Sequence, residues 1–269
     1  MENPTEQRGR EALPPFSTVE NYPVRKQVKT GIVGLDEMLS GGLLEGSITL
    51  VKGAPGTGKT TLGIQFLYSG ITDEDERGLL VSFEEFPFSL HRDALSLGWD
   101  LRKLEKEERL RLIFTSPRIF LASLQSPESP LNRTIQEWDI RRLVLDSISH
   151  FTRMTRDPKE LRQIYNRVIN GLKREGITSI LTSEDSGTGL STEEKGRLSF
   201  IVDNIILMRY VEIDSSMQRA ILVLKTRGSD HAKEIRRFEL RGGGIVVGTK
   251  FEGREALLSG SPRAIAPGR

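Results

Sequence analysis

The chain has 269 residues, and its 39 Lys and Arg side chains nearly balance its 37 Asp and Glu side chains. A net charge of +2 does not by itself indicate a nucleic-acid-binding protein. The absence of cysteine excludes disulfides, thiol chemistry and cysteine-held metals. No apolar run is long enough for a signal peptide or a membrane span, so we expect a cytoplasmic protein with no membrane partner.

In chain order, the predicted elements form one α/β domain between two tails. Residues 1–24 and 251–269 are polar and contain proline, and we expect both tails to be poorly ordered. Over residues 25–250, helical patterns alternate with apolar strand-like runs, which are SITLVKG, GLLVSFEE, LRLIFTS, RRLVLDS and TSILTSED. This alternation predicts a mostly parallel sheet with helices on both faces.

The stretch GAPGTGKTT, residues 53–61, follows the first strand and precedes an amphipathic pattern. It fits the phosphate-loop pattern G-x-x-x-x-G-K-[ST], in which glycines let backbone N–H groups converge on phosphate at a helix N-terminus. Lys59 would contact the β- and γ-phosphates, and Thr60 would offer its hydroxyl to Mg²⁺. A structural glycine turn would not need this Lys-Thr pair. The predicted nucleotide-binding residues are Gly53, Ala54, Pro55, Gly56, Thr57, Gly58, Lys59, Thr60 and Thr61.

Acidic residues end two later strands. Asp146 ends RRLVLD, where an acid beside the phosphate loop would hold Mg²⁺ through water. The next residue is Ser147, so a general base must come from another strand end on the same edge of the sheet. Glu84 and Glu85 end LLVSFEE, and strand alternation would aim one at the attacking water and the other at the magnesium shell. A solvated strand end is the simpler alternative for this pair.

The second half of the chain contains one clear helix and a run of strands. Residues 121–134, LASLQSPESPLNRT, are rich in Ser and Pro and predict a loop. Residues 157–176 predict a helix that Asp157 caps, Pro158 begins and Gly176 ends. After residue 200, the runs NIILMRYVEI, RAILVLKTRG and IRRFEL follow one another without a helical pattern between them. They predict antiparallel strands that extend the same sheet.

Together these features resemble a RecA-like P-loop NTPase core of the KaiC/RadA type. The resemblance lies in KTGIVGLDEMLSGGLLEGSITLVKGAPGTGKTT, FEE, SLGWD and DNIILMRYVEI…RAILVLKTRGSDH, and it covers roughly residues 26–262. It implies a single KaiC-like ATPase domain, whereas the cyanobacterial clock protein has two in tandem. It also implies ATP and Mg²⁺ as cofactors and a homo-oligomeric, hexameric ring.

The resemblance assigns roles to individual residues. Glu84 matches the family's general base, and Glu85 matches its partner near magnesium. Lys225 and Arg227 match residues that reach the γ-phosphate bound to a neighbouring subunit, and a Lys-x-Arg pair suits such a charge clamp. A solvated strand edge is the alternative for that pair. His231 would line the same interface or be an exposed histidine without such a role.

Three functions stay open: an ATP-hydrolysing ring that serves a regulatory partner in signalling, a DNA-stimulated ATPase, and a nucleotide-dependent scaffold or autokinase. Residues 184–197 would face a DNA channel, but they carry four acids against Lys195 and Arg197, which disfavours DNA binding. The clock protein's Ser-Thr phosphorylation motif is not reproduced in residues 114–130, where Ser116, Ser126 and Ser129 offer ordinary hydroxyls. The paired glutamates argue against an inert scaffold.

Overall fold

One nine-stranded sheet organises the molecule. The computed structural model describes residues 26–184, 198–252, 254–255 and 263–264. The strand order is β11-β10-β9-β8-β3-β7-β6-β4-β5. The parallel strands are β3 (Ile48–Gly53), β4 (Arg77–Ser82), β5 (Leu110–Phe114), β6 (Ile140–Asp146), β7 (Thr178–Glu184) and β8 (Asn204–Ile213). The antiparallel extension is β9 (Ser216–Lys225), β10 (Arg236–Arg241) and β11 (Gly244–Lys250). The predicted α/β class with antiparallel C-terminal strands is confirmed.

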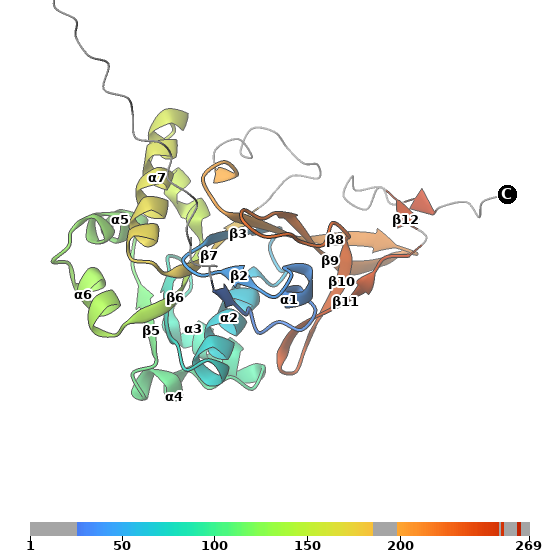
Figure 1. Cartoon of the computed structure of the whole chain (residues 1–269), viewed down its shortest axis with the longest axis horizontal. Coiled ribbons are helices and arrows are strands. Elements are labelled where there is room, and N and C mark those ends of the chain that lie inside the picture. Colours follow the sequence, from blue (N-terminus) through green and yellow to red (C-terminus); the bar gives the residue numbers. More distant parts are fainter. Residues whose placement is uncertain (1–25, 185–197, 253, 256–262, 265–269) are drawn as a thin grey trace, which may run out of the picture.

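Helices cover both faces of the sheet, which explains why its parallel strands are continuous apolar runs. One buried cluster contains α1 (Leu35–Met38), α2 (Lys59–Asp73), α3 (Pro87–Ser96) and α4 (Leu101–Lys106). The other contains α5 (Pro117–Gln125), α6 (Pro130–Glu137), the 3₁₀ helix η1 (Ile148–Arg153) and α7 (Pro158–Arg174). Figure 1 shows α5, α6 and α7 grouped together, with the C-terminal strands at the other end of the molecule. No helix in the described residues is long and apolar enough to span a membrane.

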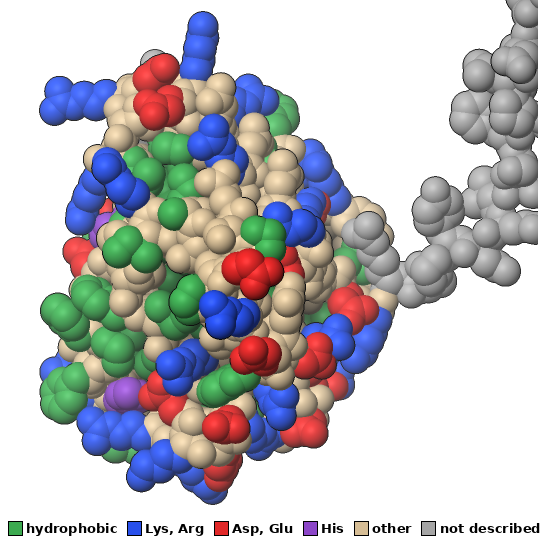
Figure 2. Space-filling model, turned by 90° about the vertical axis from the view of Figure 1, so that its left-hand side faces the viewer, with side chains coloured by type: hydrophobic (Ala, Val, Ile, Leu, Met, Phe, Trp, Pro, Cys, Tyr) green, Lys and Arg blue, Asp and Glu red, His purple; other side chains and the backbone are tan. Residues whose placement is uncertain are grey.

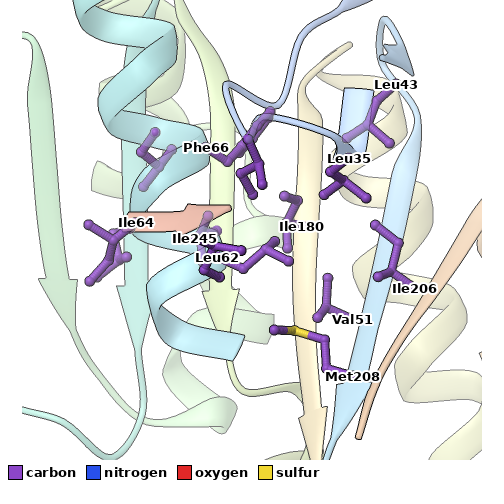
Figure 3. Close-up of a cluster of buried hydrophobic side chains, with 14 of the residues drawn as sticks. Leu35, Leu43, Val51, Leu62, Ile64, Phe66, Ile180, Ile206, Met208 and Ile245 are labelled. Atoms are coloured by element: carbon purple, nitrogen blue, oxygen red, sulfur yellow. The ribbon is translucent and has the colours of Figure 1, made fainter. Parts of the chain in front are cut away.

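The packing of α2 sets the position of the phosphate loop, because α2 begins where the loop ends. Its side chains Leu62, Ile64 and Phe66 are buried in the cluster on the sheet (Figure 3). Gly63 permits close approach, since an added Cβ would lie 2.7 Å from Val144 Cγ1 on β6. The helix therefore lies directly against the strand that ends in Asp146.

The helix predicted over residues 157–176 is confirmed as α7. The Asp157 side chain accepts a hydrogen bond from the Lys159 backbone N–H at 2.9 Å, and Pro158 occupies the first turn. Gly176 follows the helix with a φ of +69°, a left-handed conformation that suits glycine. The apolar residues of this helix are buried, as their spacing predicts.

The loop predicted over residues 121–134 is wrong, because α5 and α6 occupy most of that segment. Only residues 126–129 separate the two helices. The Ser129 hydroxyl accepts from the Asn132 backbone N–H at 3.1 Å and so caps α6. The Asn132 side chain in turn donates to the Ser126 carbonyl at 2.7 Å and closes the turn.

The segments outside the main sheet are short. Near the start of the described residues, β1 (Gln27–Val28) pairs with β2 (Leu43–Leu44). Within the predicted C-terminal tail, β12 (Arg254–Glu255) pairs with β13 (Arg263–Ala264). The N-terminal tail predicted over residues 1–24 lies outside the described residues, as does residue 25. The order of the two tails stays a prediction.

A buried arginine ties β6 to α2 beneath the candidate site. The Arg142 side chain is 1% exposed, and its guanidinium donates to Glu76 Oε2 at 2.6 Å and to the Phe66 carbonyl at 2.9 Å. It also lies 4.6 Å from the centre of the Phe66 ring. Arg142 therefore fixes the helix that carries Thr60 against the strand that carries Asp146.

Replacing Arg142 with methionine should lower the free energy of unfolding by about 3 kcal/mol, because the Glu76 carboxylate would lose its buried partner. Urea unfolding of the purified protein measures this loss. The matched control is Arg141→Met, whose parent side chain is exposed and pairs with Asp139, and it should cost less than about 1 kcal/mol. Similar small losses in both variants would contradict a structural role for Arg142.

Candidate nucleotide-binding site

The phosphate loop occupies the connection between β3 and α2. Gly56 and Gly58 have φ values of +78° and +101°, which glycine adopts without steric cost. The Tyr210 hydroxyl on β8 donates to the Gly56 carbonyl at 2.6 Å. A Cβ at Gly53 would lie 2.6 Å from the Met208 carbonyl oxygen, so glycine is required there too. These contacts fix the backbone of the loop, and its role as a phosphate cradle stays a prediction.

Lys59 begins α2 and folds back over this loop. Its Nζ donates to the Ala54 carbonyl at 3.0 Å. Burial lowers the pKa of Lys59, while the carboxylates of Asp146 and Glu184 act in the opposite direction. A phosphate would replace the carbonyl with a charged acceptor, and its negative charge would favour the protonated amine.

Thr60 and Asp146 meet beside the loop. The Thr60 hydroxyl donates to Asp146 Oδ2 at 2.7 Å, and the Thr182 hydroxyl donates to Asp146 Oδ1. The hydroxyl and the carboxylate predicted to hold Mg²⁺ from separate elements are thus in direct contact. Both line a pocket of about 190 Å³ whose other walls are Pro55, Gly56, Lys59, Ser82, Glu84, Glu85, Ser147, His150 and Glu184.

Glu84 and Glu85 line the same pocket, but strand alternation does not orient them. That expectation is wrong because β4 ends at Ser82, before both glutamates. The Ser82 hydroxyl accepts from the backbone N–H groups of Glu85, at 3.0 Å, and Glu84, at 3.4 Å. This serine-bonded turn directs the two carboxylates toward the end of β6.

The two carboxylates have different surroundings. Burial raises the pKa of Glu85, and the nearby carboxylate of Asp146 raises it further. Glu84 is instead paired with His150, at 3.0 Å between Oε2 and Nε2. Glu85 is therefore the glutamate whose unfavourable charge a divalent cation near Asp146 would relieve.

The residues present fit Mg²⁺ bound together with a nucleotide. The described residues contain no group of three or more His, Cys, Asp or Glu side chains that could hold a metal alone. Magnesium bound with a nucleoside triphosphate needs fewer protein ligands, because phosphate oxygens and water complete its octahedral shell. The Thr60 hydroxyl and the Asp146 carboxylate meet that smaller requirement.

A second hollow, of about 280 Å³, lies against the phosphate loop on the side of α3. Thr61, the last predicted binding residue, lines it. Its apolar walls are Ile64, Leu90, Ala94, Leu97 and Leu240. Lys59, Glu85 and Asp93 also line this hollow, and its apolar walls suit the flat faces of a nucleobase.

Lys225 and Arg227 lie beyond the amino ends of the parallel strands, whereas the phosphate loop lies beyond their carboxyl ends. β8 runs parallel to β3, and β9 returns antiparallel to β8, so Lys225 pairs with Ile205 near the start of β8. The loop lies beyond the other end of these strands. A single chain therefore does not bring Lys225 or Arg227 to its own phosphate pocket, and the predicted role toward a neighbouring subunit stays a prediction.

Backbone carbonyls hold both cations in place. Lys225 Nζ donates to the Val202 carbonyl at 2.7 Å, and Arg227 donates to the Phe200 carbonyl at 2.6 Å. Burial lowers the pKa of Lys225, and the positive charge of Arg227 lowers it further. Arg227 also lines a hollow of about 970 Å³ at this edge.

His231 lies in the segment that follows these cations. Its Nδ1 is 2.9 Å from the Thr226 hydroxyl oxygen. Burial lowers the pKa of His231, and the charge of Lys233 lowers it further. The structure therefore places His231 with Arg227 at the far edge, away from the phosphate loop.

Sequence reasoning missed four residues that line the phosphate pocket, which are Ser82, Ser147, His150 and Glu184. His150 lies on η1 after Asp146 and contacts Glu84, and Glu184 ends β7 beside the phosphate loop. Glu184 ends β7 and His150 follows β6, and the carboxyl ends of these strands lie beside the phosphate loop, which is the signal that could have indicated both residues.

A phosphate loop, a Thr-Asp pair and acidic side chains at the carboxyl edge of a parallel sheet define a RecA-like P-loop ATPase domain. The chain belongs to the KaiC ATPase family, whose model, described as "ATPase: KaiC", matches residues 28–252.

Individual relatives agree with this assignment. The circadian clock oscillator protein KaiC of Parathermosynechococcus lividus is 37% identical over 240 residues, which are 89% of this chain and 44% of that protein. The circadian clock protein KaiC3 of Synechocystis is 34% identical over 92% of this chain and 49% of that protein. The chain thus spans about half the length of the curated relatives it matches. A solved KaiC-like protein from Pyrococcus horikoshii is 32% identical with a TM-score of 0.74, over 84% of this chain and all of that one.

Proposed function

We propose that the protein binds ATP with Mg²⁺ and hydrolyses it slowly, as a cytoplasmic ring whose nucleotide state regulates a protein partner in signalling. The observation that carries the proposal is the single pocket in which Lys59, the Thr60–Asp146 pair and the two glutamates come together. Membership of the KaiC ATPase family supports ATP as the nucleotide.

The chain's own groups divide the work of phosphoryl transfer. The backbone of residues 54–58 and the start of α2 hold the phosphates, and Lys59 compensates their charge. Thr60 and Asp146 would hold Mg²⁺, which would offset the charge that develops on the phosphate oxygens. Glu84 accepts the proton of the attacking water, and Glu85 supports the metal side of the pocket.

The acidic phosphate pocket and the cations Lys225 and Arg227 lie at opposite ends of the parallel strands, and this arrangement supports assembly of several chains. The phosphate pocket lacks Lys225 and Arg227 within one chain, and a head-to-tail contact would bring one chain's far edge to the next chain's phosphate loop. Such a contact closes into a ring when its rotation permits. A hexamer is the form that the family resemblance implies.

We therefore expect Arg227→Ala protein to fold and bind ATP but to show weaker assembly and lower turnover. Mixing it with Lys59→Ala protein should restore part of the activity, because one subunit supplies the phosphate loop and its neighbour supplies the arginine. ATP turnover of the mixture measures the recovery, and light scattering or native mass spectrometry verifies mixed rings.

The control for this mixing experiment is each variant alone at the same total concentration. Full activity in an isolated wild-type monomer would refute the trans role. So would mixed rings that recover no activity at any ratio. Lys225 and Arg227 would then be surface charges.

A second candidate function, stimulation by DNA, is favoured by one basic surface. Residues 153–174 carry seven Lys and Arg side chains, all exposed, against two carboxylates, whereas the whole chain has a net charge of +2. The carboxylates are engaged locally, because Asp157 caps α7 and Glu160 accepts from the Thr155 hydroxyl. Figure 2 shows blue Lys and Arg side chains at the upper and the lower ends of this face, with red Asp and Glu side chains among them. Clustered cations of this kind bind phosphate backbones.

One experiment separates the two candidates. ATP turnover is measured with and without Mg²⁺, and with and without single-stranded DNA, on a sample sized by light scattering. Mg²⁺-dependent turnover that DNA leaves unchanged supports the regulatory ring. Turnover that rises with DNA, and falls back with added salt, supports the DNA-stimulated ATPase.

A further inference from the structure

A buried histidine contacts the glutamate assigned to activate water. His150 Nε2 lies 3.0 Å from Glu84 Oε2. The histidine side chain is 6% exposed and the glutamate side chain 61%, so the buried His150 contacts a carboxylate that is largely in solvent. His150 also lines the phosphate pocket together with Lys59 and Asp146.

The surroundings of His150 leave its ring little freedom. It lies on η1, whose neighbouring residues Ile148 and Phe151 are fully buried. Phe83, which directly precedes Glu84, packs edge-on against the His150 ring with the ring centres 6.1 Å apart. The core that fixes β4 and η1 therefore also fixes the distance between the histidine and the glutamate.

The chemistry of the contact determines which atom carries the proton. An ionised carboxylate only accepts hydrogen bonds, so the proton in this contact belongs on His150 Nε2. The contact between Nε2 and Oε2 leaves Oε1 of Glu84 for the attacking water. A glutamate has three rotatable side-chain bonds. Holding it in one orientation in advance lowers the entropic cost of orienting the carboxylate for proton transfer.

We propose that His150 is a positioning residue that orients Glu84 for ATP hydrolysis. This inference rests on the proposed function, because it assigns His150 a task in that same reaction. In this role His150 acts through Glu84 rather than on the reacting atoms. The competing explanation is that His150 only fills space between Phe83 and Phe151.

Two replacements separate orientation from packing. His150→Leu keeps an apolar side chain of similar size and removes the donor, and His150→Gln keeps an N–H donor. We expect His150→Leu to lower kcat by about 10-fold or more, with the ATP dissociation constant changed by less than about 3-fold. His150→Gln should recover most of the lost rate. Melting temperature and circular dichroism verify that both variants are folded.

A double-mutant cycle tests whether the effect passes through Glu84. If His150 acts by orienting that carboxylate, His150→Leu should change the residual rate by less than about 2-fold once Glu84→Gln has removed the base. An independent structural contribution of His150 would instead lower the rate by the same factor in both backgrounds.

An NMR measurement without nucleotide tests the contact between His150 and Glu84 independently of ATP turnover. The chain has three histidines, so the ring signals of His150 can be assigned in the NMR spectrum by their loss in His150→Gln. We expect an Nε2–H signal of His150 in the wild type and a clear shift of it in Glu84→Ala. His91, which is paired with Glu105, serves as the internal reference and should not move.

The outcomes are distinguishable. A wild-type protein without Mg²⁺-dependent ATP turnover overturns the proposed function and this inference with it. Normal wild-type turnover with an unaffected His150→Leu variant overturns the inference alone. The same holds if His150→Leu lowers the rate by the same factor in the wild type and in Glu84→Gln. An unmoved His150 signal in Glu84→Ala also overturns it, because the contact would then be absent in solution.

Discussion

Replacing Lys59 with alanine should abolish ATP turnover, with a loss on the order of 10³-fold and a marked loss of ATP affinity. Lys59 is the cation that begins α2, and its Nζ lies at the Ala54 carbonyl inside the phosphate cradle. Burial lowers its pKa, and the negative charge of a bound phosphate would favour the protonated amine. Isothermal titration of ATP and steady-state turnover measure the two losses separately.

The matched control for this prediction is Lys52→Ala. Lys52 lies on β3, a short distance before the phosphate loop, and does not line the phosphate pocket. Its removal should leave turnover within about 2-fold, because this half-buried side chain does not line the phosphate pocket. Unchanged turnover in Lys59→Ala would withdraw the phosphate-loop assignment, whatever the control shows.

The phosphate site could be predicted from the sequence because its signals are local or follow from topology. The glycines and Lys59 sit in one continuous motif, and Asp146 ends a strand whose carboxyl edge must meet that loop. The location of Lys225 and Arg227 follows in the same way, because an antiparallel strand returns to the opposite edge. The strand order alone is enough to place Asp146, Lys225 and Arg227 relative to the phosphate loop.

The parts that could not be predicted depend on side-chain geometry. A lone histidine has no spacing pattern, so nothing in the sequence marks His150 as the partner of Glu84. The turn that orients both glutamates depends on the Ser82 hydroxyl, which a strand pattern hides.

The missed helices have a different cause. Ser116-Pro117 and Ser129-Pro130 are each a capping serine followed by a first-turn proline, but their composition suggested a loop. The signal was present and was outweighed by the frequency of Ser and Pro in turns.

Replacing Glu84 with glutamine should preserve ATP binding and reduce hydrolysis by about 10²- to 10⁴-fold. The amide keeps the size of the carboxylate and can keep its contact with His150 Nε2, so the pocket should retain its shape. It cannot take the proton of the attacking water. A kcat that falls while the ATP dissociation constant stays constant is the kinetic pattern of a group needed only for the chemical step. Single-turnover hydrolysis by the preformed complex measures that step directly.

Glu85→Gln is the matched comparison, because it shows which of the two glutamates is the general base. Glu85 lies against Asp146, and the repulsion between their carboxylates is what a bound cation would offset. Its replacement should therefore shift the Mg²⁺ concentration required for half-maximal turnover more than it shifts the maximal rate. If instead Glu85→Gln shows the large loss in kcat and Glu84→Gln does not, the two roles are exchanged, and the exposed, histidine-bound carboxylate is not the base. Equal rates in both variants and the wild type would leave the pair as a solvated turn after β4.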